Sequence, residues 1–237
     1  MKIIVKYSVI SLLLFTLTAC LYPEQRRVEN QTPHPDQIQL VQAAVSQFQQ
    51  DTGILPIKNR DQDTPIYQKY PIDFNKLVPK YLQTPPGNAF ESGGVFQYVL
   101  VNVEEDPTVK IIDLILVDEV RDLQMRVDQY RRDHTYPPFK DMLAKSVFTI
   151  DFEKLNIKTI PQVRSPITGD YLPYVINHEG KVLVDYSIDL YKLLQNNEHN
   201  FQAGEDIRDL IVENSFFVPV YSAPYTVEND EPVFLVN

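Results

Sequence analysis

The segment IDFNKL, Ile72–Leu77, returns as IDFEKL, Ile150–Leu155, at an offset of 78 residues. Because one short match can arise by chance, the flanking segments decide whether it belongs to a repeat. Upstream, AVSQFQQDTGILPI (44–57) aligns with RVDQYRRDHTYPPF (126–139) at an offset of 82. Downstream, the offsets are 76 for FQYVLVN (96–102) with LPYVIN (172–177) and about 72 for KIIDL (110–114) with VLVDY (182–186). The order is kept while the offsets decrease, so the sequence predicts two tandem repeats whose loops differ in length.

Each repeat is expected to begin with a long helix. Apolar residues recur in steps of three, four and three, which places them on one helical face. They are Ile38, Val41, Val45 and Phe48 in the first repeat, and Val120, Leu123, Val127 and Tyr130 in the second. This spacing predicts a face that packs into a core.

The IDFxKL segment is expected to form a short helix, with Asp73 or Asp151 as its N-cap and with Phe74 and Phe152 buried. Two pairs of β-rich runs follow the short helices, and they predict antiparallel hairpins: 96–103 with 109–117, and 172–177 with 181–187. The residues Asn177-His178-Glu179-Gly180 have the composition of a hairpin turn. The sequence therefore predicts an α+β fold of two tandem repeats, each with a long helix, a short helix and an antiparallel hairpin or small sheet.

The C-terminal region falls outside the repeats. Residues 205–213 are expected to form a short helix, and FFVPVYSAPYTVENDEPVFLV (216–236) is a β-rich segment interrupted by prolines. Since proline donates no ladder hydrogen bond, this segment should run along an edge or over the surface. Its aromatic side chains could pack against the second repeat or contact a partner, and they are the tentative interaction residues: Phe216, Phe217, Tyr221 and Tyr225.

The N-terminus has the order of a secretory signal peptide. Lys2 and Lys6 precede a mostly apolar run over residues 8–19, which is shorter than the ~20 residues of a membrane span. The segment LTAC, residues 17–20, resembles a bacterial lipobox. The resemblance implies that a diacylglyceryl group, with acyl chains such as palmitate, is attached to Cys20 and that residues 1–19 are removed. The alternative is a free thiol at the end of an uncleaved anchor.

Residues 20–35 contain three prolines and show no periodicity, so they are interpreted as a lipidated tether, with a chain start packed on the folded part as the alternative. The expected units are then residues 36–117, 118–200 and 201–237. The formal charge is −10, and it becomes −12 once the two lysines of residues 1–19 are removed. A unit this acidic is repelled by anionic lipid and by nucleic acid, so the expected membrane contact is the lipid on Cys20.

The repeats carry a family resemblance. A helix ending in F/Y, D, G and P, then LVPKYL, then PPGNAFESGGVFQYV resembles the globular half of type II secretion major pseudopilins over residues 38–117, and more faintly over 120–187. This resemblance implies a fold and not pilus assembly, because the prepilin cleavage site is replaced by a lipobox and a tether. The whole chain also resembles the YphF-type lipoproteins of Bacillus-like bacteria.

The residues give no catalytic, metal or cofactor prediction. The four histidines, His34, His134, His178 and His199, lack zinc-ligand spacing, and the seven glycines form no nucleophile elbow or phosphate-binding loop. Acidic pairs at 61–63, 104–106 and 228–231 lack the spacing of a calcium loop, although a weak calcium site stays an alternative.

We therefore expect a non-enzymatic lipoprotein at the outer face of a bacterial cell membrane, with an envelope protein as its partner. The aromatics of residues 216–225, or the Glu91-Ser92-Gly93-Gly94 loop that the second repeat lacks, are the expected partner surface. A solute-capturing lipoprotein of an ABC-type transporter is the alternative, and an envelope hydrolase is the third candidate.

Overall fold

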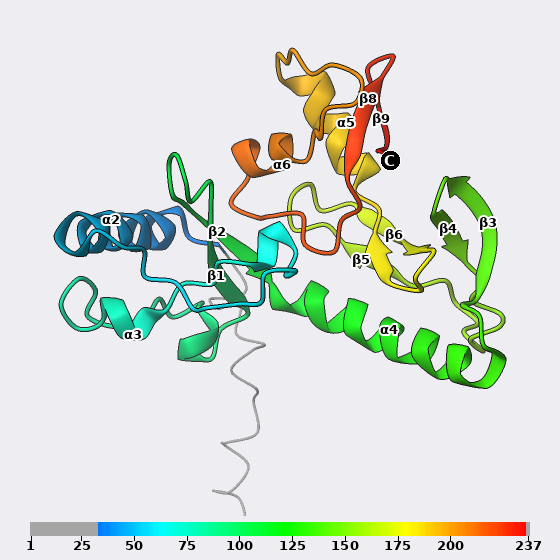
Figure 1. Cartoon of the computed structure of the whole chain (residues 1–237), viewed down its shortest axis with the longest axis horizontal. Coiled ribbons are helices and arrows are strands. Elements are labelled where there is room, and N and C mark those ends of the chain that lie inside the picture. Colours follow the sequence, from blue (N-terminus) through cyan, green and yellow to red (C-terminus); the bar gives the residue numbers. More distant parts are fainter. Residues whose placement is uncertain (1–32, 236–237) are drawn as a thin grey trace, which may run out of the picture.

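The computed structural model describes residues 33–235. The first half of the fold begins with the long helix α2 (Pro35–Thr52) and ends with an antiparallel hairpin (Figure 1). Three short helices lie between them: η4 (Ile66–Gln68), α3 (Phe74–Leu77) and η5 (Phe90–Ser92). The hairpin consists of β1 (Phe96–Val101) and β2 (Thr108–Asp113). Residues 1–32, with the predicted signal peptide, Cys20 and most of the tether, lie outside the described residues.

The second half begins without a linker. Helix α4 (Leu114–His134) follows β2 directly, because the Asp113 side chain accepts a hydrogen bond of 2.8 Å from the backbone N–H of Ile115 and caps the helix. The strands that follow are β3 (Phe139–Ala144), β4 (Val147–Ile150), β5 (Gln162–Arg164), β6 (Tyr171–Asn177) and β7 (Val182–Val184). They form an antiparallel sheet in the order β3-β4-β6-β5, and β7 also pairs with β6.

Two more helices and a hairpin complete the chain. They are α5 (Ser187–Asn196), α6 (Asp209–Asn214) and the pair β8 (Tyr225–Glu228) and β9 (Glu231–Phe234). Within residues 33–235, every helix is too short or too polar to span a bilayer.

Residues 216–222, which we call the strap, run between the two halves. Phe217 makes a parallel bridge to Ile111 of β2, and Ser222 makes one to Val184 of β7 (Figure 1). The strap therefore extends both hairpins at their outer edges, although Pro219 keeps it from forming a regular strand. This agrees with the predicted edge position.

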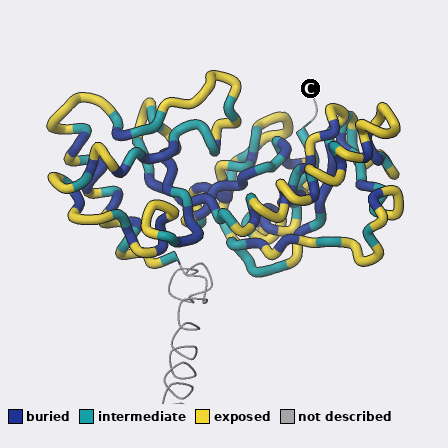
Figure 2. The backbone as a smooth tube through the Cα atoms, turned by 90° about the horizontal axis from the view of Figure 1, so that it is seen from below, coloured by how far each residue is buried: buried dark blue, intermediate teal, exposed yellow. Residues whose placement is uncertain are grey.

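The core crosses from one half to the other. One buried cluster lies in the first half and includes Phe217 of the strap. The other fills the second half, but Tyr67, Val99 and Ile112 of the first half belong to it. Buried backbone accordingly continues through the junction between the halves (Figure 2). Because they share apolar side chains, the halves cannot separate without exposing core surface to water.

The α+β class and both long helices are confirmed. All eight predicted core positions are buried, together with Ala44 in α2 and Leu116 in α4. Each helix ends at a residue in the left-handed conformation, Gly53 at φ 72° and Thr135 at φ 67°. The hairpin turn before Gly180 is also confirmed, since the Asn177 side chain accepts hydrogen bonds from two backbone N–H groups of the turn.

Several local predictions are wrong. Residues 114–117 are the first turn of α4 and not strand, because Asp113 caps a helix there; the expected boundary at 117/118 therefore lies inside α4. Residues 152–156 form turns instead of a short helix, with hydrogen bonds to the carbonyl three residues back and with Asn156 at φ 57°. Phe152 is consequently only half-buried, whereas Phe74 is 3% exposed.

The structure also contains elements that the sequence does not predict. The sequence predicts neither the β3–β4 hairpin nor α5, and Ser187, placed in a strand, begins that helix. The predicted C-terminal helix is present but starts at Asp209, and Pro35, assigned to the tether, is the first residue of α2. The two-repeat pattern itself stays a prediction.

Candidate functional site

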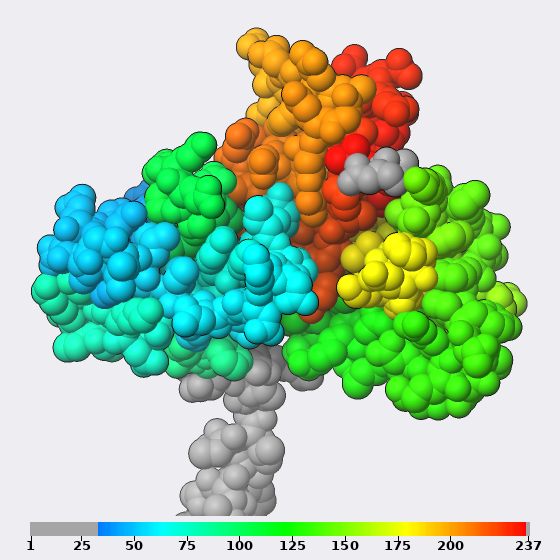
Figure 3. All heavy atoms as spheres, viewed as in Figure 1, coloured from blue at the N-terminus to red at the C-terminus, as the bar shows by residue number. Residues whose placement is uncertain are grey.

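A cleft of about 580 Å³ lies where the two halves and the strap meet. We call it the α4–strap cleft. Its walls come from η4 in the first half, from α4 and β7 in the second half, from Arg208, the residue before α6, and from the strap (Figure 3, where η4 is cyan and the strap orange). The lining residues that carry the argument are Ile66, Arg121, Lys181, Arg208, Pro219 and Tyr221. Its volume falls in the range of small-molecule sites in proteins.

The wall made by α4 and β7 is fixed by one glutamine. Gln124 Nε2 donates to the Gly180 carbonyl at 2.9 Å, and its Oε1 accepts from the Val182 N–H at 2.7 Å. The Gln124 side chain thereby pairs the Gly180 carbonyl and the Val182 N–H, two backbone groups that would otherwise be left without partners at the sheet edge.

The strap wall is held by backbone hydrogen bonds and contains an unusual residue. The Val184 N–H donates to the Tyr221 carbonyl at 3.0 Å, and the buried Tyr186 hydroxyl donates to the Val220 carbonyl at 3.1 Å. Tyr221 has φ 58°, a left-handed conformation that costs a bulky side chain free energy. Its ring nevertheless stays in the cleft wall, and partial burial raises the pKa of its hydroxyl.

The η4 wall divides two clefts of opposite charge. Ile66 and Tyr67 line the α4–strap cleft on one side and a second cleft of about 400 Å³ on the other. Among the described residues, the charged side chains lining the first cleft are the three cations Arg121, Lys181 and Arg208, and those lining the second are Glu104, Glu105 and Asp209. In a chain with 32 acidic and 22 basic residues, this separation makes the α4–strap cleft an exception to the overall charge.

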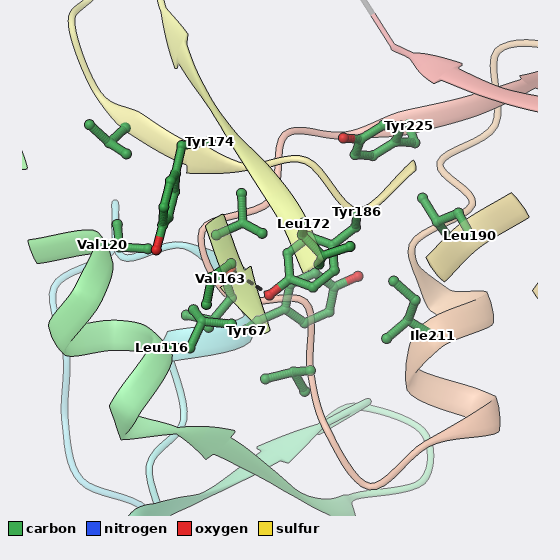
Figure 4. Close-up of a cluster of buried hydrophobic side chains, with 14 of the residues drawn as sticks. Tyr67, Leu116, Val120, Val163, Leu172, Tyr174, Tyr186, Leu190, Ile211 and Tyr225 are labelled. Carbon is green, nitrogen blue, oxygen red and sulfur yellow. Dashed lines mark hydrogen bonds between the residues drawn. The ribbon is translucent and has the colours of Figure 1, made fainter. Parts of the chain in front are cut away.

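Tyr67 fixes the position of the dividing wall. It is buried in the second-half cluster, close to Leu116 of α4 and Tyr186 (Figure 4). Its hydroxyl donates to Asp209 Oδ1 at 3.2 Å, and the Arg208 guanidinium lies 5.2 Å from its ring centroid. Burial, followed by the charge of Asp209, raises the pKa of the Tyr67 hydroxyl well above its ordinary value, so Tyr67 is a neutral donor at neutral pH.

The three cations differ in how firmly they are held. Arg121 and Lys181 are exposed and pair with acids on their own segments, Asp118 at 2.8 Å and Glu179 at 2.9 Å. Arg208 is largely buried and is held by both oxygens of Asp206 at 2.6 to 3.0 Å. Two of the cations can therefore move toward a ligand, and the third is fixed.

A buried hydroxyl–carboxylate cluster lies elsewhere in the second half. Ser165 Oγ donates to Asp189 at 2.7 Å, and Thr168 Oγ1 donates to its other oxygen at 2.5 Å. Burial raises the pKa of the Asp189 carboxyl, against the opposing effect of these hydrogen bonds. The Ser165 hydroxyl also accepts from the backbone N–H groups of Ile167 and Thr168, so the cluster organises the 165–169 loop on α5.

The four aromatic residues predicted to contact a partner fall into a buried pair and a more accessible pair. Phe217 and Tyr225 are 5% and 0% exposed, with Phe217 edge-on to Phe96 at 5.7 Å and Tyr225 donating to Asp185 at 2.7 Å. Phe216 is 37% exposed, and Tyr221 is partly buried in the cleft wall. Burial favours the packing interpretation for Phe217 and Tyr225, and leaves Phe216 and Tyr221 accessible to a partner.

The second expected partner surface, residues 91–94, is well ordered by its contacts. Glu91 pairs with Lys58 at 2.8 Å, and Ser92 donates to the Pro85 carbonyl. A side chain at Gly94 would lie 2.1 Å from the Asn88 backbone, so this glycine is required by close packing. Within residues 33–235, no three histidine, cysteine or acidic side chains are grouped to hold a metal ion, and this includes the acidic pairs considered for calcium.

Sequence reasoning missed the charged residues of the cleft. Arg121, Lys181 and Arg208 are far apart in the chain and follow no shared spacing. Arg121 and Lys181 stand beside core positions of α4 and β7, so only the pairing of these elements brings the cations together.

Comparison with known proteins found one family match. No curated protein and no solved structure shows significant similarity to the chain. The match covers residues 34–113, which run from the residue before α2 to the last residue of β2, the N-cap of α4. The first half of the fold thus matches the model of the YphF family N-terminal domain.

Proposed function

We propose that this chain is an extracytoplasmic lipoprotein, anchored through Cys20 and non-enzymatic, whose folded part binds another component of the cell envelope at the outer face of the membrane. The observation that carries the anchoring is LTAC at residues 17–20, directly after the apolar run. Two acyl chains on one residue hold a protein on a bilayer, where a single chain is marginal.

The start of the fold suits such an anchor. Helix α2 begins at Pro35, so about 15 residues separate it from Cys20. A flexible chain of that length has a root-mean-square reach of ~20 Å, which is enough to keep an acidic domain off an anionic lipid surface. The binding role is supported by the α4–strap cleft, with Tyr221 in its wall, and by the exposed Phe216 at the start of the strap.

Replacement of the anchor residue tests the lipid attachment. Cells that express the parent chain or Cys20→Ser are labelled with a radioactive fatty acid, and the label on the immunoprecipitated chain is measured. We expect labelled parent and unlabelled variant, because the sulfur is the attachment atom. Equal labelling of the two chains would refute the lipoprotein assignment.

The binding role is tested by crosslinking in intact cells. A photoreactive residue at position 216 should capture a defined envelope component, while the same residue at the exposed Tyr191 of α5 serves as the control. Identical products from both positions would contradict a role for the strap in binding.

The alternative is a solute-capturing lipoprotein of a transporter, and the volume of the α4–strap cleft favours it. The shared core argues against a lobe-closing mechanism of this kind, because α4 follows β2 directly and Val99, Val101 and Ile112 pack into the second half. We therefore keep the envelope-binding role as the proposal.

A further inference from the structure

We propose that the α4–strap cleft is a binding site for a small organic anion with an apolar body. The proposal goes beyond an envelope-binding role, because it names a ligand class for one site and holds whichever component the anchored protein contacts.

Charge complementarity is the first argument. Of the described residues that line the cleft, three are cations and none is an acid, although acids outnumber bases in the chain. The neighbouring cleft on the far side of Tyr67 has the reverse lining, with Glu104, Glu105 and Asp209. An anion therefore meets cations with which it can pair on one side of η4, and acids on the other.

The cations can exchange partners at small cost. The side chains of Arg121 and Lys181 are 64% and 71% exposed, and their ion pairs with Asp118 and Glu179 are equally solvated. Solvated pairs of this kind contribute little to stability, so a ligand anion competes with them on favourable terms. Arg208 does not need to move, because Asp206 and the Tyr67 ring already fix its guanidinium at the cleft.

The apolar surface of the cleft is the second argument. Ile66 is 62% exposed, and its side chain lies beside a wall made by Val120, Leu183, Pro219 and Tyr221. A ligand body placed against this wall would cover Ile66 and the accessible part of the Tyr221 ring. Removing this surface from water is the favourable contribution that an inorganic anion could not supply.

The walls of the cleft are already held in place. Gln124 fixes β7 to α4, and the hydrogen bond from Val184 to Tyr221 fixes the strap to β7. The left-handed backbone at Tyr221 is a local cost that the surrounding hydrogen bonds maintain. A site that is formed before binding loses less conformational entropy when the ligand arrives.

Three matched probes test the proposal by isothermal titration calorimetry. They are 2-naphthalenesulfonate, the neutral 2-naphthalenesulfonamide and the cationic 2-naphthylmethylammonium. The full chain is held in phosphatidylcholine nanodiscs by its N-terminal residues, and empty nanodiscs provide the blank. We expect the sulfonate to bind one to one, at least about tenfold more tightly than the sulfonamide, because each exposed cation contributes about threefold, and the ammonium to bind most weakly.

Variants then locate the site. The double variant Arg121→Gln/Lys181→Gln should weaken sulfonate binding about tenfold and leave the sulfonamide nearly unchanged, since each exposed cation contributes about threefold. Ile66→Ser should weaken the sulfonate and the sulfonamide by a similar factor, because it removes apolar contact. The matched control is Lys80→Gln, a cation 68% exposed and paired with Asp51 in the first half, which should change nothing.

Four results would overturn the proposal: no sulfonate binding up to millimolar concentrations, an equal affinity for all three probes, binding that survives the double variant, or an equal loss in Lys80→Gln. Thermal unfolding of each variant shows that a loss of binding is not a loss of fold, and all four substituted side chains are exposed. The titration needs neither an acyl group on Cys20 nor a cellular partner. It can therefore fail while the proposed function stands, and the proposed function can fail while the titration succeeds.

Discussion

The two α+β halves, residues 35–113 and 114–196, attach their long helices to their hairpins with the same pair of hydrogen bonds. Gln42 Nε2 donates to the Pro107 carbonyl at 2.9 Å and its Oε1 accepts from the Val109 N–H at 2.7 Å, just as Gln124 does in the second half. The two glutamines are 82 residues apart, which is the offset of the aligned helices.

The strap accepts a backbone hydrogen bond from each of the two hairpins. The Ile111 N–H donates to the Phe216 carbonyl at 2.9 Å, and the Val184 N–H donates to the Tyr221 carbonyl at 3.0 Å. Ile111 and Val184 are 73 residues apart. The same separation holds between Val109 and Val182, the valines whose N–H groups the two glutamines accept from. These contacts agree with a duplicated unit, although the two-repeat pattern stays a prediction.

The halves differ in how they complete their cores. The first half has a two-stranded sheet and needs Phe217 of the strap, while the second has its own larger sheet and takes in Val99, Val101 and Ile112 from the first. Similar backbone hydrogen bonds have thus been combined with different packing. The comparison shows that the first half depends on the rest of the chain for its core. Three tests address the likeness and the difference between the two halves.

The largest effect is expected from truncation after Glu213. The deletion removes five buried apolar side chains from the two clusters: Phe217, Val218, Val220, Tyr225 and Val227. Losing this much apolar burial exceeds the marginal stability of a domain, so the truncated chain should lose its cooperative thermal transition in circular dichroism.

The control for truncation is Asp230→Gly at the exposed tip of the β8–β9 hairpin. Asp230 has φ 62°, which glycine adopts without strain, so this change should move stability by less than about 0.5 kcal/mol. A truncated chain that melts cooperatively near the parental temperature would show that the halves close their cores without the strap.

The next effect compares the two phenylalanines of the matching IDF segments. Phe74 is 3% exposed and edge-on to Tyr98 at 5.7 Å, so Phe74→Ala should cost about 3–5 kcal/mol in denaturant unfolding. Phe152 is half-buried, and Phe152→Ala should cost about 1–2 kcal/mol. Equal costs would contradict the different packing of the two segments.

The smallest effect compares the two glutamines. Gln42→Ala and Gln124→Ala each leave a buried valine N–H without its partner, so each should cost about 1–3 kcal/mol, and the two costs should agree within about 1 kcal/mol. The control is Gln129→Ala, an exposed residue of α4 bonded to Asp133, with an expected cost near zero. If only one glutamine mattered, the equivalence of the two attachments would be lost.

Much of the fold could be predicted from periodicity. The steps of three and four residues identified both long helices and their buried faces, and the composition of residues 177–180 identified one hairpin turn. Asp73 was expected to cap a short helix, and its side chain accepts from the Asn75 N–H at 3.2 Å.

A local cap, a missing alternation and tertiary contacts account for the parts that sequence reasoning missed. The apolar run over residues 109–117 suits a strand until the Asp113 side chain caps α4 and ends it. The β3–β4 hairpin has Met142 and Leu143 exposed, so its sequence lacks the alternation that predicts a half-buried strand. The cleft combines side chains from five segments, and no local pattern contains that information.

The strap also determines the stage of synthesis at which folding can be completed. Its contacts with Ile111 join residues more than one hundred positions apart, and its seven residues follow both hairpins in the chain. During synthesis, both hairpin edges therefore stay without this partner until the strap has left the ribosome. Until then these edges are open to pairing with other strands, so the strap also protects the newly made chain from aggregation.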